Sequence, residues 1–182
     1  MSKILGIDPG TNVLGYAVID TDLHPIIIIS LGVVKLDALE DHYAKLKHIY
    51  ERLMAVIVNF KPAEMAIETP LYAGNALSML KLGRAQGIAI AAAMMSGLPV
   101  TEYLPKKVKK SITGNGNATK EQLADMLQNL LKFDTMPSYL DATDALGVAL
   151  CHHFQQKPGI SAPGKCGNWK NFLKENPYRI KK

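Results

Sequence analysis

The stretch ILGIDPGTNVLGYAVID, residues 4–20, decides how the fold begins. Two apolar runs flank the segment DPGT, residues 8–11, and its Pro-Gly pair is typical of a turn. The pattern predicts two antiparallel strands, 3–7 and 14–19, joined by a tight connection. The carboxylate of Asp8 then stands at the mouth of a hairpin whose arms both have the pattern of buried strands. There it could bind a metal ion, hold a nucleotide or only stabilise the turn.

The composition is that of one globular domain. The chain has 182 residues, of which 48% are apolar and 20% are charged, which suits a real core and excludes a disordered chain. The net charge of +5 favours a polyanionic partner. Two cysteines make neither a disulfide framework nor a zinc pattern. No signal peptide precedes the first strand, and the most apolar stretch, 87–100, is too short to cross a bilayer, so we expect a cytoplasmic protein without membrane association.

The rest of the chain alternates between strand and helix patterns. Residues 25–34 are rich in β-branched side chains, as central strands are. Further strands are predicted at 64–68 and 98–103, and helices at 39–60, 75–96, 105–112, 119–131 and 138–154. This order predicts an α/β fold with a mixed five-stranded sheet flanked by helices. The later strands need helical crossovers and should be parallel. We expect one domain over 1–156 and a basic, flexible tail over 157–182.

Four acidic residues stand at the ends of these elements. Asp8 ends the first strand, Glu68 closes EMAIE before a proline, and Asp141 and Asp144 lie on one helix face at positions i and i+3. Each has an ordinary explanation when it is taken alone. Asp8 could stabilise its turn, Glu68 could be a charge at a strand end, and Asp141 could pair with a cap at Ser138. Both aspartates also favour a helix N-terminus through the helix dipole.

Taken together, the four acids favour a metal site. If their carboxylates converge unpaired, they repel one another, and a divalent cation is the simplest remedy. Carboxylate oxygens without His or Cys select Mg²⁺ or Mn²⁺ over zinc. Two such ions about 4 Å apart would serve the hydrolysis of a phosphodiester.

Four motifs in order resemble those of the RuvC family, the bacterial Holliday junction resolvases. They are GIDPGTNVLGYAVID, AIETPLYAGNALSMLKLGRAQGIAIAAA, VKKSITGNGNATKEQL and LDATDALGVALCHH, and the resemblance covers about residues 3–154. It implies a ribonuclease H-like fold and a homodimer that nicks two opposing strands of a four-way junction in recombination and repair. It further implies that Asp8, Glu68, Asp141 and Asp144 are the catalytic acids and hold two Mg²⁺ or Mn²⁺ ions, with Asp8 between them. The cut would leave 5′-phosphate and 3′-hydroxyl ends.

The basic residues are the predicted DNA contacts. Lys106, Lys107, Lys109 and Lys110 lie within five residues, and Lys120 follows the GNGNA loop. A run of this kind is often a solvated helix face, but no acid balances it between Glu102 and Glu121, which suits phosphate binding. In the family, lysines of these segments face DNA, and either Lys109 or Lys110 matches together with Lys120.

Two further expectations rest on the resemblance. Many family members carry an aromatic residue shortly after the catalytic Glu, whereas here Leu71 takes that position and Tyr72 follows. Tyr72 could stack on a base or line a turn. The helix at 75–96 is apolar on more than one face, so it could be a core helix or form a dimer interface. The basic tail could contact DNA or the branch-migration proteins RuvA and RuvB.

Three other functions compete with this interpretation. Phosphotransferases and ATPases of the actin type open with a similar hairpin, but they need two such domains and a second phosphate loop. A DNA-binding module without activity would have no use for all four acids. A nuclease of the same fold that acts on RNA–DNA hybrids or pre-ribosomal RNA would differ only in its substrate.

Overall fold

The computed structural model describes residues 2–39, 41–70, 75–132 and 139–156. Its strands are β1 (Lys3–Asp8), β2 (Val13–Asp20), β3 (Ile27–Lys35), β4 (Glu64–Glu68) and β5 (Val100–Tyr103). Its helices are α1 (His42–Phe60), α2 (Ala76–Met95), α3 (Pro105–Thr113), α4 (Lys120–Leu131) and α5 (Leu140–Gln156). All ten predicted elements are confirmed, with ends that shift by a few residues. The predicted cap Ser138 and the tail 157–182 lie outside the described residues.

The sheet is mixed, as predicted. Its strand order is β3-β2-β1-β4-β5. The strands β1, β2 and β3 pair antiparallel, while β4 runs parallel to both β1 and β5. The prediction that the third strand is central was wrong, because β3 lies at an edge. Its β-branched residues still pack on both sides, with Ile29 against one core cluster and Ile28 against the other.

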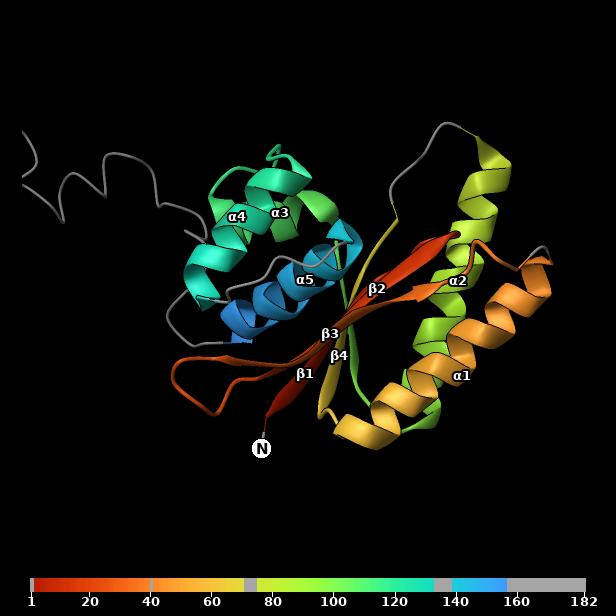
Figure 1. The fold of residues 1–182 in the computed structure, drawn as a ribbon, viewed down its shortest axis with the longest axis horizontal. Coiled ribbons are helices and arrows are strands. Elements are labelled where there is room, and N and C mark those ends of the chain that lie inside the picture. The colour runs from red at the N-terminus through yellow and green to blue at the C-terminus, as the bar shows by residue number, and fades with distance from the viewer. Residues whose placement is uncertain (1, 40, 71–74, 133–138, 157–182) are drawn as a thin grey trace, which may run out of the picture.

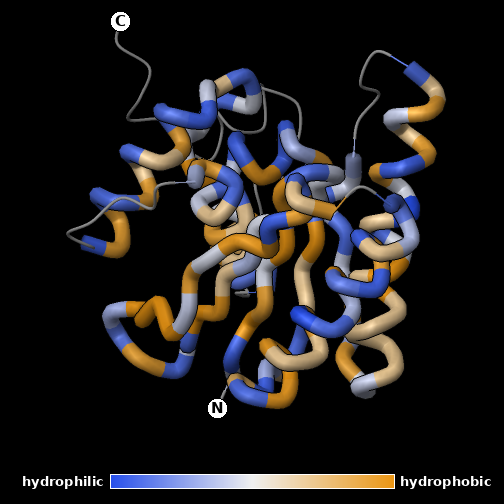
Figure 2. Tube along the Cα trace, turned by 45° about the vertical axis from the view of Figure 1, so that its right-hand side comes forward, coloured by the Kyte–Doolittle hydropathy of each residue, from blue (hydrophilic) through white to orange (hydrophobic). Residues whose placement is uncertain are grey.

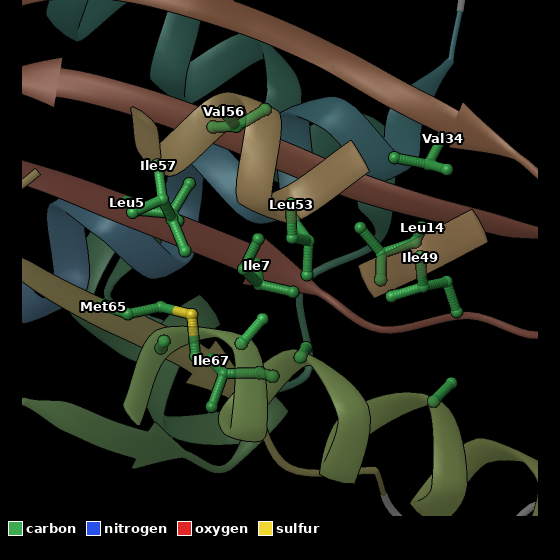
Figure 3. Packing of buried hydrophobic residues seen from close by; sticks show 14 of the residues in the cluster. Leu5, Ile7, Leu14, Val34, Ile49, Leu53, Val56, Ile57, Met65 and Ile67 are labelled. Carbon is green, nitrogen blue, oxygen red and sulfur yellow. The ribbon is translucent and has the colours of Figure 1, made fainter. Parts of the chain in front are cut away.

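Two layers of helices cover the sheet. Figure 1 shows α1 and α2 side by side on one face, and α3, α4 and α5 on the other. Hydrophobic residues run along the central strands in Figure 2. In β1, Leu5 and Ile7 point toward α1 and α2, where they meet Leu53 and Met65 (Figure 3), whereas Ile4 packs in the cluster under α5. Because side chains alternate along a strand, Asp8 follows Ile4 onto the α5 face.

Two glycines allow α5 to lie unusually close to the sheet. A Cβ atom added at Gly6 would lie 2.2 Å from the backbone oxygen of Ala145, and one added at Gly15 would lie 1.9 Å from that of Asp141. Gly15 pairs with Asp8 across the hairpin. The start of α5 therefore rests on the residue beside Asp8, and this contact fixes where the helix presents its acids.

A buried hydrogen-bond chain holds the other end of α5. His152 Nδ1 lies 2.8 Å from the Tyr103 hydroxyl, and its Nε2 lies 2.9 Å from Glu64 Oε2. Burial raises the pKa of Tyr103 to about 12, so the phenol keeps its proton. These hydrogen bonds connect α5 to β4 through Glu64 and to β5 through Tyr103.

Replacing Gly15 by alanine should destabilise the fold, because the new methyl group would overlap a backbone oxygen. We expect a loss of about 2 kcal/mol or more in the free energy of unfolding. Gly147→Ala is the matched control. Gly147 lies in α5, the helix that Gly15 contacts, and a Cβ atom added there would have Val108 Cγ1 as its nearest neighbour, at 3.4 Å. It should stay within about 1 kcal/mol of wild type. Urea unfolding measures both, and equal stabilities would contradict the close-contact account.

Candidate active site

Three carboxylates from two elements converge where β1 ends and α5 begins. One oxygen each of Asp8, Asp141 and Asp144 lies within 4.8 Å of the others. Asp8 ends β1, while the two aspartates lie one turn apart at the start of α5. The pairing of β1 with β2 sets the position of Asp8. The i and i+3 spacing places Asp141 and Asp144 on the same face of α5. Asp144 is buried, and the other two are partly exposed.

Glu68 stands beside this group but is not one of the three. It ends β4, directly after Ile67, which pairs with Ile7 in the neighbouring strand. Its side chain is near enough for its charge to contribute, after burial, to the raised pKa of Asp8, and for the charge of Asp144 to contribute to its own raised pKa. All four predicted acids thus lie at the same edge of the sheet, with the three aspartates in the tighter cluster.

Lys120, the first residue of α4, points into the carboxylates. Its Nζ lies 2.6 Å from Asp144 Oδ2 and 2.9 Å from Asp141 Oδ1. A capping box fixes the start of this helix: the Thr119 hydroxyl accepts from the Gln122 amide, and the Gln122 side chain accepts from Thr119 N. We expected Lys120 to contact DNA. Its pairing with the acids could not be predicted from local patterns, because Lys120 and Asp144 are far apart in the chain.

The acids perturb one another strongly. Burial, then the charges of Glu68 and Asp144, raise the pKa of Asp8 well above its ordinary value. Burial, with the charge of Asp144, raises the pKa of Glu68 to about 7. Burial also raises the pKa of Asp144, although its hydrogen bond to Lys120 works against the shift. Burial alone would lower the pKa of Lys120, but its bonds to Asp144 and Asp141 outweigh it and raise that pKa.

The predicted basic helix α3 lies beside this centre. Val108 and Ile112 bury one face of it, and Lys106, Lys107 and Lys110 are exposed on the other. Lys109 is partly buried, and its charge works against the upward pKa shifts that burial causes in Glu68 and Asp144. Of the adjacent pair that the sequence left open, Lys109 is therefore the one close enough to affect the acids.

Lys107 also contacts an aromatic ring, since its Nζ lies 5.0 Å from the centre of the Tyr103 ring.

The two residues considered for base stacking, Leu71 and Tyr72, lie outside the described residues. Their roles stay predictions.

The donor set fits a hard divalent cation. The cluster offers carboxylate oxygens from Asp8, Asp141 and Asp144, with Glu68 beside them, and neither His nor Cys joins the group among the described residues. One ammonium group, that of Lys120, cannot balance these charges, and burial together with the remaining repulsion between carboxylates raises the pKa values of Asp8 and Glu68. Oxygen ligands of this kind suit Mg²⁺ or Mn²⁺.

The mixed sheet with carboxylates at the ends of β1 and β4 and at the start of α5 defines a ribonuclease H-like nuclease whose acidic centre could hold a metal ion. The family model described as "Crossover junction endodeoxyribonuclease RuvC" matches residues 4–152. The chain therefore belongs to the RuvC family of crossover junction endodeoxyribonucleases.

Individual relatives agree with this assignment. The RuvC protein of Cytophaga hutchinsonii is 53% identical over 98% of this chain and 88% of its own length. That of Bacteroides fragilis is 48% identical over 98% of this chain and 95% of its own. The solved structure of Thermus thermophilus RuvC in complex with Holliday junction substrate is 31% identical, with a TM-score of 0.78, over 85% of this chain and 94% of that one.

In the part of the chain that the structure describes, no helix combines the length and the apolar character needed to span a membrane.

The pKa of Glu68 predicts a pH-dependent stability. The folded value of about 7 lies above the ordinary 4.5, so the folded state holds this proton more tightly than the unfolded chain does. As pH rises from about 4.5 to 7, the unfolded chain ionises first, and the wild-type protein loses stability from this group. Glu68→Gln removes that loss, and in EDTA it should be more stable than wild type by about 2–3 kcal/mol at pH 8 and by little at pH 4.5.

Urea unfolding at the two pH values measures this difference. Glu51→Gln, on the exposed face of α1, is the control and should show no such change between them. A Glu68→Gln variant whose advantage is independent of pH would show that Glu68 is ionised at its ordinary pKa.

Proposed function

We propose that this chain resolves four-way DNA junctions by paired, symmetric hydrolytic nicks, with Mg²⁺ or Mn²⁺ held by Asp8, Glu68, Asp141 and Asp144. The observation that carries the proposal is the meeting of these carboxylates at one edge of the sheet in a chain of the RuvC family. The related Thermus thermophilus protein is described with a Holliday junction as its substrate. Recombination and repair are the processes that such a reaction serves.

The four acids would hold the ions and orient the phosphate. When bound, two divalent ions would supply Lewis acidity at the scissile phosphate and would make a water molecule more acidic. Asp8 is the central ligand in this proposal, because its carboxylate lies between those of α5 and the Glu68 carboxylate of β4. The rigid strand ends and the close packing of α5 keep the ligands in place during the reaction.

Lys120 would exchange partners as ions load. Its ammonium group is held by Asp144 and Asp141, the carboxylates that the ions would need. Once those carboxylates have another cation, Lys120 is free to donate to an oxygen of the scissile phosphate. Lys109, close to the same acids, would contact a neighbouring phosphate. The exposed Lys106, Lys107 and Lys110 extend this positive surface along α3.

A homodimer would bring two such centres to the junction. The helix α2 carries an exposed stripe at helical spacing that includes Leu77, Leu80 and Met94. Gly83 and Gly87 lie within the helix, and a Cβ atom added at either would meet nothing within 4 Å. Small residues allow a second helix to approach closely, so this stripe suits pairing with another copy of α2. Two centres related by a two-fold axis would then cut two opposing strands.

Replacing Asp8 by asparagine should abolish cleavage without loss of binding. The change removes one charge and one ligand while it keeps the size of the side chain, and it relieves repulsion in the acid cluster. We expect a loss of at least about a thousandfold in the cleavage rate, because the ions would lose their central ligand and could no longer activate the water. A gel-shift assay in EDTA and a cleavage assay in Mg²⁺, both on the same synthetic junction, measure the two quantities.

Asp22→Asn, at an exposed position two residues after β2, serves as the charge-matched control and should cut normally. A folded Asp8→Asn protein that cuts at the normal rate would overturn the site assignment.

Leu80→Glu should separate the dimer, since it places a charge in the middle of the apolar stripe of α2. Sedimentation at about 10 µM protein should give a dimer for wild type and a monomer for the variant. Val58→Glu is the control: Val58 is 62% exposed on α1, outside the stripe, and its variant should remain dimeric. A wild-type monomer, or a dimer that both variants preserve, would rule out this interface.

A further inference from the structure

A cationic pocket lies where the β1–β2 connection, which follows Asp8, meets the N-terminal parts of α1 and α2. Its volume is about 190 Å³, and it is lined by Thr11, Asn12, His42, Lys45, Ser78 and Lys81. The first two residues come from the hairpin connection, and the others come from the first turns of α1 and α2. The pocket therefore joins the helices of one face of the sheet to the turn that follows Asp8.

The positive charge of this pocket is not balanced. Neither Lys45 nor Lys81 has a carboxylate within ion-pair distance among the described residues. Lys45 Nζ reaches only neutral oxygens, the Thr11 carbonyl and Asn12 Oδ1, each at 3.4 Å. The nearby Asp41 carboxylate accepts a hydrogen bond from the Ala44 amide, as the cap of α1. Two ammonium groups thus face one cleft, and no carboxylate of the described residues pairs with either of them.

Neutral donors complete the lining. The hydroxyls of Thr11 and Ser78 make no hydrogen bond within the part of the chain that the structure describes, and both are free to donate. Nε2 of His42 is buried and has no hydrogen-bond partner among those residues. Two lysines with hydroxyl and imidazole groups around them form a site for a small oxyanion with several acceptor oxygens, and a phosphate group meets that description.

The position of the pocket indicates which phosphate it takes. Thr11 follows Asp8 by three residues, so the two Cα atoms are at most about 11 Å apart. A DNA strand advances about 3.4 Å per nucleotide along the helix axis. A strand whose scissile phosphate lies at Asp8 therefore brings another phosphate to the pocket within about three nucleotides.

We propose that this pocket binds a backbone phosphate of the DNA strand that is cut, on the side of the acidic centre away from α3. The inference rests on the proposed function and adds a second anchor to it. With α3 on one side and the pocket on the other, the strand is held across the carboxylates, so the scissile phosphate cannot slide along the edge of the sheet. The pocket thus acts as a positioning site for the cut.

The salt dependence of binding tests the pocket. We would measure binding of a four-way junction in EDTA at several NaCl concentrations for wild type and for Lys45→Gln/Lys81→Gln. The charge-matched control is Lys47→Gln/Lys61→Gln, which changes one exposed lysine in α1 and one directly after it. The slope of log K against log salt is negative, and one lost phosphate contact decreases its magnitude by about 0.9. We expect that decrease for the pocket variant and none for the control. Equal slopes for both variants would overturn the proposal.

Single methylphosphonate linkages locate the phosphate, because each removes one backbone charge. We would place one such linkage in turn at each of the three positions on either side of the cut. At one of these positions it should weaken binding by wild type about tenfold and binding by the pocket variant less than twofold. A wild type that binds and cuts the junction but shows no coupling at any position would refute the pocket while the nuclease function stands. A wild type that neither binds nor cuts would refute both.

Inorganic phosphate is the remaining arm. If 10 mM phosphate protects wild type but not the pocket variant against heat, and the slopes stay equal, the site takes free phosphate and the DNA assignment is wrong.

Discussion

The contact between α5 and the β1–β2 hairpin is the constraint on which the site depends. Gly6 and Gly15 have no side chain to keep the helix away, so the backbone of α5 rests on the strands at Ala145 and Asp141. Gly15 also pairs with Asp8. One packing interaction therefore decides both the stability of the sheet-helix layer and the distance between the carboxylates. The chain His152–Tyr103 holds the opposite end of the same helix, so α5 is fixed at both ends.

That packing concentrates negative charge in a half-buried place, which costs stability unless a cation is present. Lys120 supplies one positive charge from α4, which does not neutralise all the carboxylates. Burial and the repulsion that remains between the carboxylates raise the pKa values of Asp8 and Glu68. Binding of divalent ions would relieve the repulsion between these carboxylates even before a substrate binds. Lysines at α3 and in the pocket of α1 and α2 then give the edge of the sheet an alternation of charge, negative at the centre and positive on both sides, which suits a phosphate backbone.

Much of this could be predicted from the sequence, for physical reasons. Turn residues, helical periodicity and strand alternation are local signals, and they located all ten elements and the ends where the four acids stand. The edge position of β3 was missed because β-branched composition reports burial and not strand order. The pairing of Lys120 with Asp144 and the meeting of Lys45 with Lys81 depend on helices that are distant in the chain. No local pattern carries such contacts.

The most direct measurement is the cleavage of an end-labelled synthetic four-way junction by the full chain, in Mg²⁺ and in EDTA, beside a linear duplex and an RNA–DNA hybrid of the same sequence. The account predicts paired nicks at symmetric positions of the junction in Mg²⁺ and none in EDTA, with the duplex and the hybrid left intact. An intact junction beside a cut hybrid would contradict it, and so would junction nicks that persist in EDTA.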